Sequence, residues 1–231
     1  MDAKQIIARR VAKELKDGYV VNLGIGLPTL IPNYLPPGIN ITLQSENGFL
    51  GLGPLAGEPV PGLVNAGGQP CGMVPGGVFF DSAMSFVLIR GGHVDATVLG
   101  ALQVDGHGNL ANWMVPGKMV PGMGGAMDLV TGAKHVIVAM EHCTKDGSAK
   151  ILKECSLPLT CKGKVHMIVT EMAVFRIDNG LILEELGPGV SIEDVRKCTE
   201  ADFTVSPNCT IQSEGIEEAT CGCVGTPGGG A

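Results

Sequence analysis

Aromatic residues are the scarcest class in this chain, at 4% of its 231 residues. We therefore expect a core built from Val, Ile, Leu, Ala and Met. Hydrophobic residues make up 45% of the chain and charged residues 17%, which is typical of a folded globular protein rather than a disordered one. The length fits one large α/β domain or two small ones.

Basic residues are also fewer than acidic residues. Lys and Arg number 16 against 23 Asp and Glu, a formal net charge of −7, which argues against a nucleic-acid partner. No uninterrupted apolar run reaches about 18 residues, so we expect no membrane-spanning helix and no membrane partner. The opening residues, MDAKQ, carry charge where a secretory signal would continue into an apolar segment. The sequence therefore predicts a cytoplasmic protein.

The eight cysteines lack the paired spacing of a zinc site. Only Cys221 and Cys223 lie close together, and no second pair accompanies them. In a cytosolic chain of this size, such cysteines are expected to be reduced and mostly buried. We expect no metal site and no cofactor.

Hydrophobic patterning alternates between helical and strand-like segments. Residues 4–16 repeat apolar side chains at helical spacing, and residues 81–90 form a second expected helix with Asp81 or Ser82 as N-cap. Expected strands cover residues 19–23, 96–104, 110–114, 135–140, 165–170 and 203–205, and a short helix is expected near 28–34. This alternation predicts an α/β fold with a mainly parallel sheet and flanking helices.

Three further segments complete the prediction. Residues 49–80 are rich in Gly and Pro and are expected to form irregular loops with brief strands. The Asp-Asn-Gly sequence at 178–180 predicts a hairpin, and Ser191 with Asp194 begins a helix of capping-box type. We expect one domain over residues 1–206, followed by a mobile tail over 207–231 that is rich in glycine.

A single carboxylate, Glu46, is the strongest candidate for chemistry. It follows an apolar run in the segment QSENG, where Asn47 and Gly48 allow a sharp turn. A carboxylate held at the end of a strand can attack an acyl group and carry it as an anhydride or thioester. Taken alone this signal is weak, because most Glu residues are solvated surface groups.

Two glycine loops strengthen the case for Glu46 as a reactive carboxylate. Gly24, Ile25 and Gly26 follow one strand-like run, and Gly124 and Gly125 belong to a second loop that opens a helix. Strand ends gather at one edge of an open α/β sheet, so the three turns could meet around one ligand, with backbone amides facing it. These glycines are also compatible with simple tight turns. A dinucleotide fold is the weaker alternative, because Thr29 stands where a third glycine would be needed.

Five motifs in order resemble the β subunit of family I coenzyme A transferases, the short-chain acyl and 3-oxoacid enzymes. The resemblance extends from Met1 to about residue 206 and departs from the family pattern in the tail. It rests on residues 22–29 (NLGIGLPT), 44–48 (QSENG), 89–93 (IRGGH), 110–113 (LANW) with 116–118 (PGK), and 122–128 (GMGGAMD). It implies a CoA-transferase fold, which is related to that of sugar-phosphate isomerases.

The resemblance also implies a mechanism. Glu46 would pass through an acyl anhydride to a glutamyl-CoA thioester, with Gly125 supplying an oxyanion-binding amide. Gly24, Ile25, Gly26, Asn47, Gly124 and Lys118 are candidates for binding CoA or substrate, although Asn47 is also compatible with a plain turn residue and Lys118 with a solvated surface group. Asp128 more plausibly caps or pairs than catalyses, and His93 is more plausibly structural.

A partner and two rival functions follow from the same reasoning. The two-chain members of the family place the CoA cleft between an α and a β subunit, so an α subunit in a heterodimer or α2β2 assembly is expected. It could supply the basic groups that this acidic chain lacks. One rival is a sugar-phosphate isomerase-like or ligand-binding protein of the same broad fold. The other is a non-catalytic subunit that only stabilises its partner.

Overall fold

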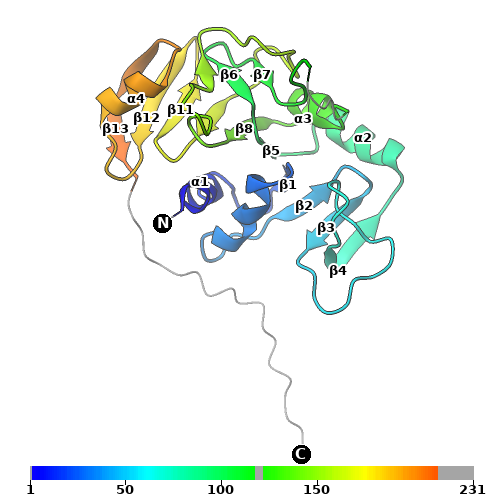
Figure 1. Cartoon of the computed structure of the whole chain (residues 1–231). Helices are drawn as coiled ribbons and strands as arrows, with labels where there is room; N and C mark the ends of the chain where they lie inside the picture. Colours follow the sequence, from blue (N-terminus) through cyan, green and yellow to red (C-terminus); the bar gives the residue numbers. More distant parts are fainter. Residues whose placement is uncertain (1, 118–121, 213–231) are drawn as a thin grey trace, which may run out of the picture.

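A ten-stranded sheet organises the molecule, and the computed structural model describes residues 2–117 and 122–212 (Figure 1). The strand order is β13-β12-β11-β10-β8-β5-β1-β2-β3-β4. At its centre lie five strands joined by parallel pairing: β2 (Thr42–Ser45), β1 (Val20–Leu23), β5 (Ala96–Leu99), β8 (His135–Ala139) and β10 (Met167–Val169). Their carboxyl ends therefore share one edge of the sheet. The predicted α/β fold with parallel strands is confirmed at this centre.

Both flanks of the sheet depart from the parallel pattern. Next to β2, the strands β3 (Phe49–Gly53) and β4 (Gly72–Phe79) pair antiparallel. Next to β10, β11 (Ala173–Ile177) and β12 (Leu181–Leu186) form the predicted hairpin, with Asn179 at φ 50° in its turn. The last strand, β13 (Phe203–Ile211), pairs parallel with β12.

The structure corrects three expectations about strands. Residues 96–104 form two strands instead of one, because the chain leaves the main sheet after β5. It then forms β6 (Gln103–Asp105), which belongs to a separate three-stranded sheet with β7 (Leu110–Ala111) and β9 (Ile151–Leu152). Residues 49–80 are more regular than expected, since they contain all of β3 and β4. The mobile tail was predicted to begin at residue 207, but β13 continues to Ile211. The rest of the predicted tail, from 213 onward, lies outside the described residues.

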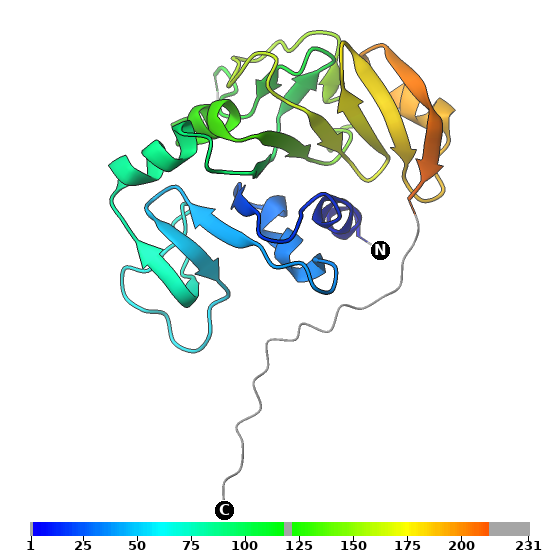
Figure 2. The same cartoon turned by 180° about the vertical axis from the view of Figure 1, so that it is seen from behind.

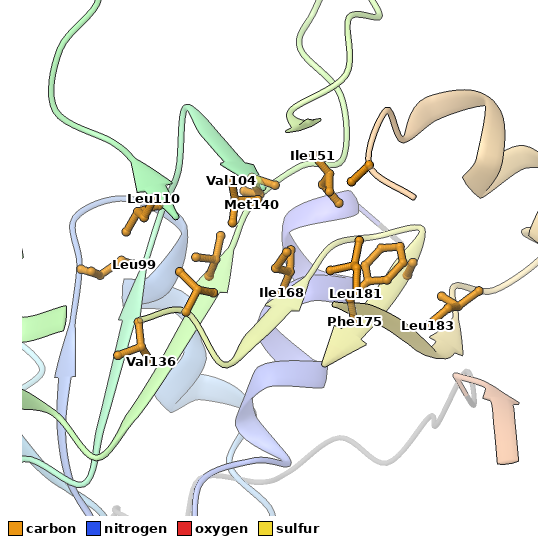
Figure 3. Packing of buried hydrophobic residues seen from close by; sticks show 14 of the residues in the cluster. Leu99, Val104, Leu110, Val136, Met140, Ile151, Ile168, Phe175, Leu181 and Leu183 are labelled. Carbon is orange, nitrogen blue, oxygen red and sulfur yellow. The ribbon is translucent and has the colours of Figure 1, made fainter. Parts of the chain in front are cut away.

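Helices and loops cover both faces of the sheet. On one face α1 (Ala3–Ala12) and the 3₁₀ helix η1 (Leu27–Tyr34) enclose a core that includes Ile7, Val11 and Ile31. On the other face, the small sheet and α4 (Ile192–Cys198) enclose a second core around Phe175 and Ile168 (Figure 3). The predicted helix at 191 begins with a complete capping box between Ser191 and Asp194.

The remaining two helices lie beside the strands that lead to the candidate site. They are α2 (Ser82–Arg90), with Asp81 as its N-cap, and α3 (Ala126–Gly132). Six cysteines are free thiols, as expected, but only Cys71 is buried; the other five are partly exposed, namely Cys143, Cys155, Cys161, Cys198 and Cys209. Cys221 and Cys223 lie outside the described residues. None of the helices in the described part of the chain has the length and apolar character needed to cross a membrane.

Candidate active site

Glu46 occupies the tight turn between β2 and β3, at the carboxyl edge of the parallel strands. Gly48 makes this turn possible, since it has φ 127° and a Cβ there would lie 2.3 Å from the carbonyl oxygen of Phe80. The Phe80 amide donates to the Gly48 carbonyl oxygen at 2.9 Å, which ties the turn to the end of β4. The carboxylate is thus held half-buried at a strand end, as predicted.

Gly125 faces this carboxylate from the start of α3. Its amide N–H donates to Oε1 of Glu46 at 3.1 Å, across 79 residues of sequence. A Cβ at Gly125 would lie 2.9 Å from Cδ of Glu46, so only glycine lets the backbone come so close. At Gly124 it is the backbone that favours glycine, since its φ is 55°, whereas a Cβ there would lie at an ordinary contact distance of 3.6 Å from Oε1. The two residues that the family resemblance links in catalysis are therefore in direct contact.

The surroundings of Glu46 alter its acidity. Burial raises the pKa of the Glu46 carboxyl above its ordinary value, the hydrogen bond from Gly125 opposes this, and the nearby charge of Asp128 adds to the rise. The net direction is upward. A carboxylate whose charge is poorly solvated is a more reactive nucleophile toward a thioester, provided that it remains ionised at the working pH.

The first glycine loop lies at the same edge of the sheet. Because β1 and β2 are parallel neighbours, Gly24 and Glu46 both follow carboxyl ends of adjacent strands. Gly24 donates its amide to the carbonyl oxygen of Val98 at 2.8 Å, so this amide holds the loop against β5. Gly26, at φ 85°, is the N-cap of η1, and the side chain of Ile25 is 70% exposed.

Two of the predicted site features differ in detail from expectation, and a third is not tested. The loop that carries Gly124 and Gly125 does not follow a strand of the main sheet; it arrives from β7 of the small sheet. The Asn47 side chain is already engaged, since it accepts from the Ser45 hydroxyl at 2.5 Å and donates to the Val64 carbonyl at 2.8 Å. It thereby fastens residues 54–71 to the turn. Lys118 lies outside the described residues, so its role stays a prediction.

One pairing near the site was not predicted in full. Asp128 pairs, as expected, but its partner is Arg90 at the end of α2, with Nε of Arg90 donating to Oδ1 at 2.7 Å. Nothing in the sequence marks these two residues as partners, because they are 38 positions apart. Asn112 has a structural role, since its side-chain amide donates to the Gly100 carbonyl and its Oδ1 accepts from the Thr160 hydroxyl.

A shallow apolar groove, here called the β4 groove, lies between β4 and the loop that precedes it. It has a volume of about 600 Å³, and its lining includes the exposed side chains of Leu55, Val60, Met73 and Phe79. The ring of Phe79 packs against Phe49, three residues after Glu46, with centroids 5.5 Å apart. The sequence analysis assigned no role to this surface.

Residues 2–117 and 122–212 contain no group of three or more His, Cys, Asp or Glu side chains suited to a metal ion. The expectation that the chemistry needs no metal or other cofactor stays a prediction.

Comparisons with known proteins agree with this geometry. A family model described as coenzyme A transferase matches residues 4–197. The acetate CoA-transferase subunit beta of Escherichia coli (strain K12) is 68% identical over 213 residues, which cover 92% of this chain and 98% of that protein. The mitochondrial succinyl-CoA:3-ketoacid coenzyme A transferase 2A of Rattus norvegicus is 54% identical over 87% of this chain, which spans only 40% of the rat protein.

The fold recurs in solved structures. An acyl-CoA transferase from Escherichia coli O157:H7, solved as the apoenzyme, superposes with a TM-score of 0.75 at 23% identity. The match covers 92% of this chain and 43% of that one. At this identity the likeness establishes the fold alone, and it shows that this fold can occupy less than half of a longer chain.

Proposed function

The chain belongs to the coenzyme A transferase family, and from this premise we propose that it is the β subunit of an acyl-CoA:carboxylate CoA-transferase. The donor class is a short-chain acyl-CoA or 3-oxoacyl-CoA, and the acceptor is a carboxylic acid such as acetate or acetoacetate. The names of relatives that match nearly the whole chain, or nearly the whole of their own length, support this class. A cytoplasmic location stays a prediction from the sequence.

The observation that carries the proposal is the hydrogen bond from the Gly125 amide to Oε1 of Glu46. In the proposed reaction Glu46 attacks the acyl-CoA carbonyl, which gives a mixed anhydride and CoA thiolate. The thiolate then attacks the Glu46 carbonyl carbon and releases the first carboxylic acid, which leaves a glutamyl-CoA thioester. The acceptor carboxylate reverses both steps, so the chemistry is ping-pong.

The Gly125 amide has a defined part in this scheme. Once Glu46 is acylated through one oxygen, the other is a carbonyl oxygen, and negative charge develops on it when the thiolate attacks. An amide already aimed at that oxygen stabilises the charge without reorganising. Both intermediates hydrolyse, so water must be excluded. The β3 strand and the exposed β4 groove give a partner chain an apolar surface to cover for that purpose.

We propose that this partner is the α subunit, in a heterodimer or α2β2 assembly. The single-chain relatives supply the argument, because this chain spans only about two fifths of the rat protein and of the solved bacterial transferase. The remaining length of those proteins is available to form the other half of the site. In a two-chain enzyme a separate subunit would provide it.

Covalent trapping tests the function directly. The complex of this chain with its α subunit is incubated with acyl-CoA and then treated with borohydride, which reduces a thioester to a primary alcohol. We expect mass spectrometry to place the alcohol at Glu46 in the wild-type protein. The Glu46→Gln variant should show no reduction and should lose transfer activity, because an amide is a very poor nucleophile.

The outcome separates the proposal from its rivals. An unmodified Glu46 together with full transfer activity would move the nucleophile elsewhere. An unmodified Glu46 without transfer activity would favour an isomerase-like or purely structural subunit. The variant should unfold at a temperature close to that of the wild type, since Gln is nearly isosteric and its carbonyl oxygen can still accept the Gly125 hydrogen bond.

A further inference from the structure

The helix α2 connects the two halves of the Glu46–Gly125 pair. It follows β4 and lies between the β2–β4 strands and α3, an arrangement that both views of the molecule show (Figures 1 and 2). The carboxyl of Asp81 caps its first turn by accepting from the Met84 amide at 2.8 Å. A helix in this place can set the distance between the strand that carries Glu46 and the helix that begins at Gly125.

The contact between α2 and β2 is polar and buried. Nε2 of Gln44, two residues before Glu46, donates to the Ser85 hydroxyl at 2.9 Å, and both side chains are almost fully enclosed. Oε1 of Gln44 in turn accepts from the Asn22 amide at 2.7 Å, which extends the connection to β1. Buried hydrogen bonds of this kind favour a single arrangement of the elements that they join.

The contact between α2 and α3 is close and ends in an ion pair. A Cβ at Gly132 would lie 2.1 Å from the Ile89 carbonyl oxygen, so the two helices approach through glycine. Arg90, the last residue of α2, then donates to Asp128 in the first turn of α3. Asp128 lies three residues after Gly125, whose amide binds Glu46.

We infer that Arg90 and Asp128 are positioning residues for the reaction of Glu46. Their ion pair holds the first turn of α3 against α2, while Gln44 and Ser85 hold α2 against β2. The Gly125 amide and the Glu46 carboxylate are thereby kept at hydrogen-bonding distance by a closed circuit of contacts. This inference rests on the proposed function, because it assigns the two residues a part in CoA transfer.

The ion pair also bears on the charge of the site. Burial is the main cause of the raised pKa of Glu46, the Gly125 amide opposes the rise, and the carboxylate of Asp128 adds to it. Arg90 places a cation directly on Asp128 and so offsets part of its negative field. Loss of Arg90 and loss of the Asp128 charge should consequently move the pKa of Glu46 in opposite directions, whereas a purely structural pair would produce no such opposition.

Three variants of the full complex test this assignment. Arg90→Met removes the donor and the cation. We expect its kcat to fall by about tenfold, as small misplacements of reacting groups do, and the acid limb of its pH–rate profile to move to higher pH. Asp128→Asn keeps an acceptor but removes the charge, so its acid limb should move to lower pH. Arg176→Met is the matched control, because Arg176 makes a similar exposed pair with Glu184 at 2.6 Å on the distant β11–β12 hairpin.

A second measurement makes the test independent of turnover. The titration of Glu46 is followed by carbon-13 NMR of labelled Glu carboxyls in this chain and assigned by the signal missing from Glu46→Gln. Opposite displacements in Arg90→Met and Asp128→Asn, with Arg176→Met unchanged, support the assignment. If the pKa of Glu46 moves in the same direction in both variants, the assignment is overturned. It is also overturned if both variants keep the Glu46 pKa and the kcat of the wild type. Failure of the wild-type complex to transfer CoA would instead overturn the proposed function.

Discussion

At the scale of single residues, Gly125 controls how closely an amide can approach the reacting carboxylate. Its backbone lies at φ −81° and ψ 3°, which any residue can adopt, so no conformational demand requires glycine there. The demand comes from Glu46, whose Cδ would lie 2.9 Å from an added Cβ. Glycine is therefore required at position 125 by the contact with Glu46 and not by the backbone conformation.

Substitution of Gly125 by alanine tests whether the close approach of its amide to Glu46 matters for catalysis. The added methyl group should push the Glu46 carboxylate away from the amide, and we expect kcat to fall about a hundredfold, the size of effect seen when an oxyanion donor is lost. Thermal unfolding should change little, because the carboxylate is the movable end of a flexible side chain. Gly122→Ala is the control, since nothing lies within 4 Å of its Cβ position. Equal activity of the two variants would show that the contact has no catalytic value.

Local sequence signals pointed to single candidate residues, whereas contacts between residues far apart in the sequence left no such signal. Glu46 followed by Asn and Gly, and the paired Gly124 and Gly125, could be recognised in the sequence. The Arg90–Asp128 pair could not, because an arginine at the end of one helix has many possible partners until the fold is known. Asn47 was recognised as a turn residue, yet its bond to the Val64 carbonyl depends on a loop without a sequence signature.

At the scale of elements, the β2–β3 turn determines where the Glu46 carboxylate lies. Gly48 combines φ 127° with a Cβ position only 2.3 Å from the Phe80 carbonyl oxygen. The same turn is joined to β4 through the bond from the Phe80 amide to the Gly48 carbonyl. A side chain at this position has to distort the turn or separate it from β4, and either change displaces Glu46.

We therefore expect Gly48→Ala to destabilise the protein. The strained backbone alone costs about 1–3 kcal/mol, and the clash with the Phe80 carbonyl adds to that. Urea unfolding of the purified chain, followed by far-ultraviolet circular dichroism, measures the loss. Gly100→Ala should be close to neutral, because its backbone is not in the left-handed region and its Cβ position is open. Equal stability of the two variants would mean that the turn relaxes without strain.

Elements were predictable where capping, turn or periodic signals were strong. The hairpin at Asn179 and Gly180, the capped helices α2 and α4, and the buried strand β8 all follow from such signals. The division of residues 96–104 into β5 and β6 could not be seen, because ATVLGALQV is apolar almost throughout. At Gly100 the chain passes from the main sheet to the small sheet, and this depends on tertiary packing that the local sequence does not reveal. Only brief strands were expected where the full strand β4 lies, because its Gly and Pro content is typical of loops.

At the scale of the whole molecule, the sheet ends in an edge that leaves apolar groups exposed beside the active turn. The strand β4 forms one edge of the ten-stranded sheet, and its Phe79 is 60% exposed. Edge strands of this kind usually require cover. The opposite edge, β13, shows a comparable exposed residue in Ile211, at 67%, but it lies far from Glu46 in the strand order. The two edges thus offer a matched comparison of surfaces near to and remote from the site.

The β4 groove should be a binding surface for the α subunit. Val60→Asp places a charge in the groove from a loop residue that is 59% exposed, so it should leave unfolding of the isolated chain nearly unchanged. Phe79→Ser removes the largest apolar side chain in the groove. We expect each variant to weaken binding to the α subunit by about tenfold or more, as loss of a central interface residue does. Transfer activity should then return when the concentration of the α subunit is raised.

Isothermal titration of the purified chain with the α subunit measures the dissociation constant, and Ile211→Ser serves as the control on the far edge. Its binding should equal that of the wild type, since β13 is separated from β4 by the full width of the sheet. If all three variants bind alike, the α subunit covers another surface. Loss of transfer without loss of binding would instead mean that the groove contacts the substrate. Weakened binding confined to the two groove variants would identify the β4 groove as part of the interface that shields the acylated Glu46 from water.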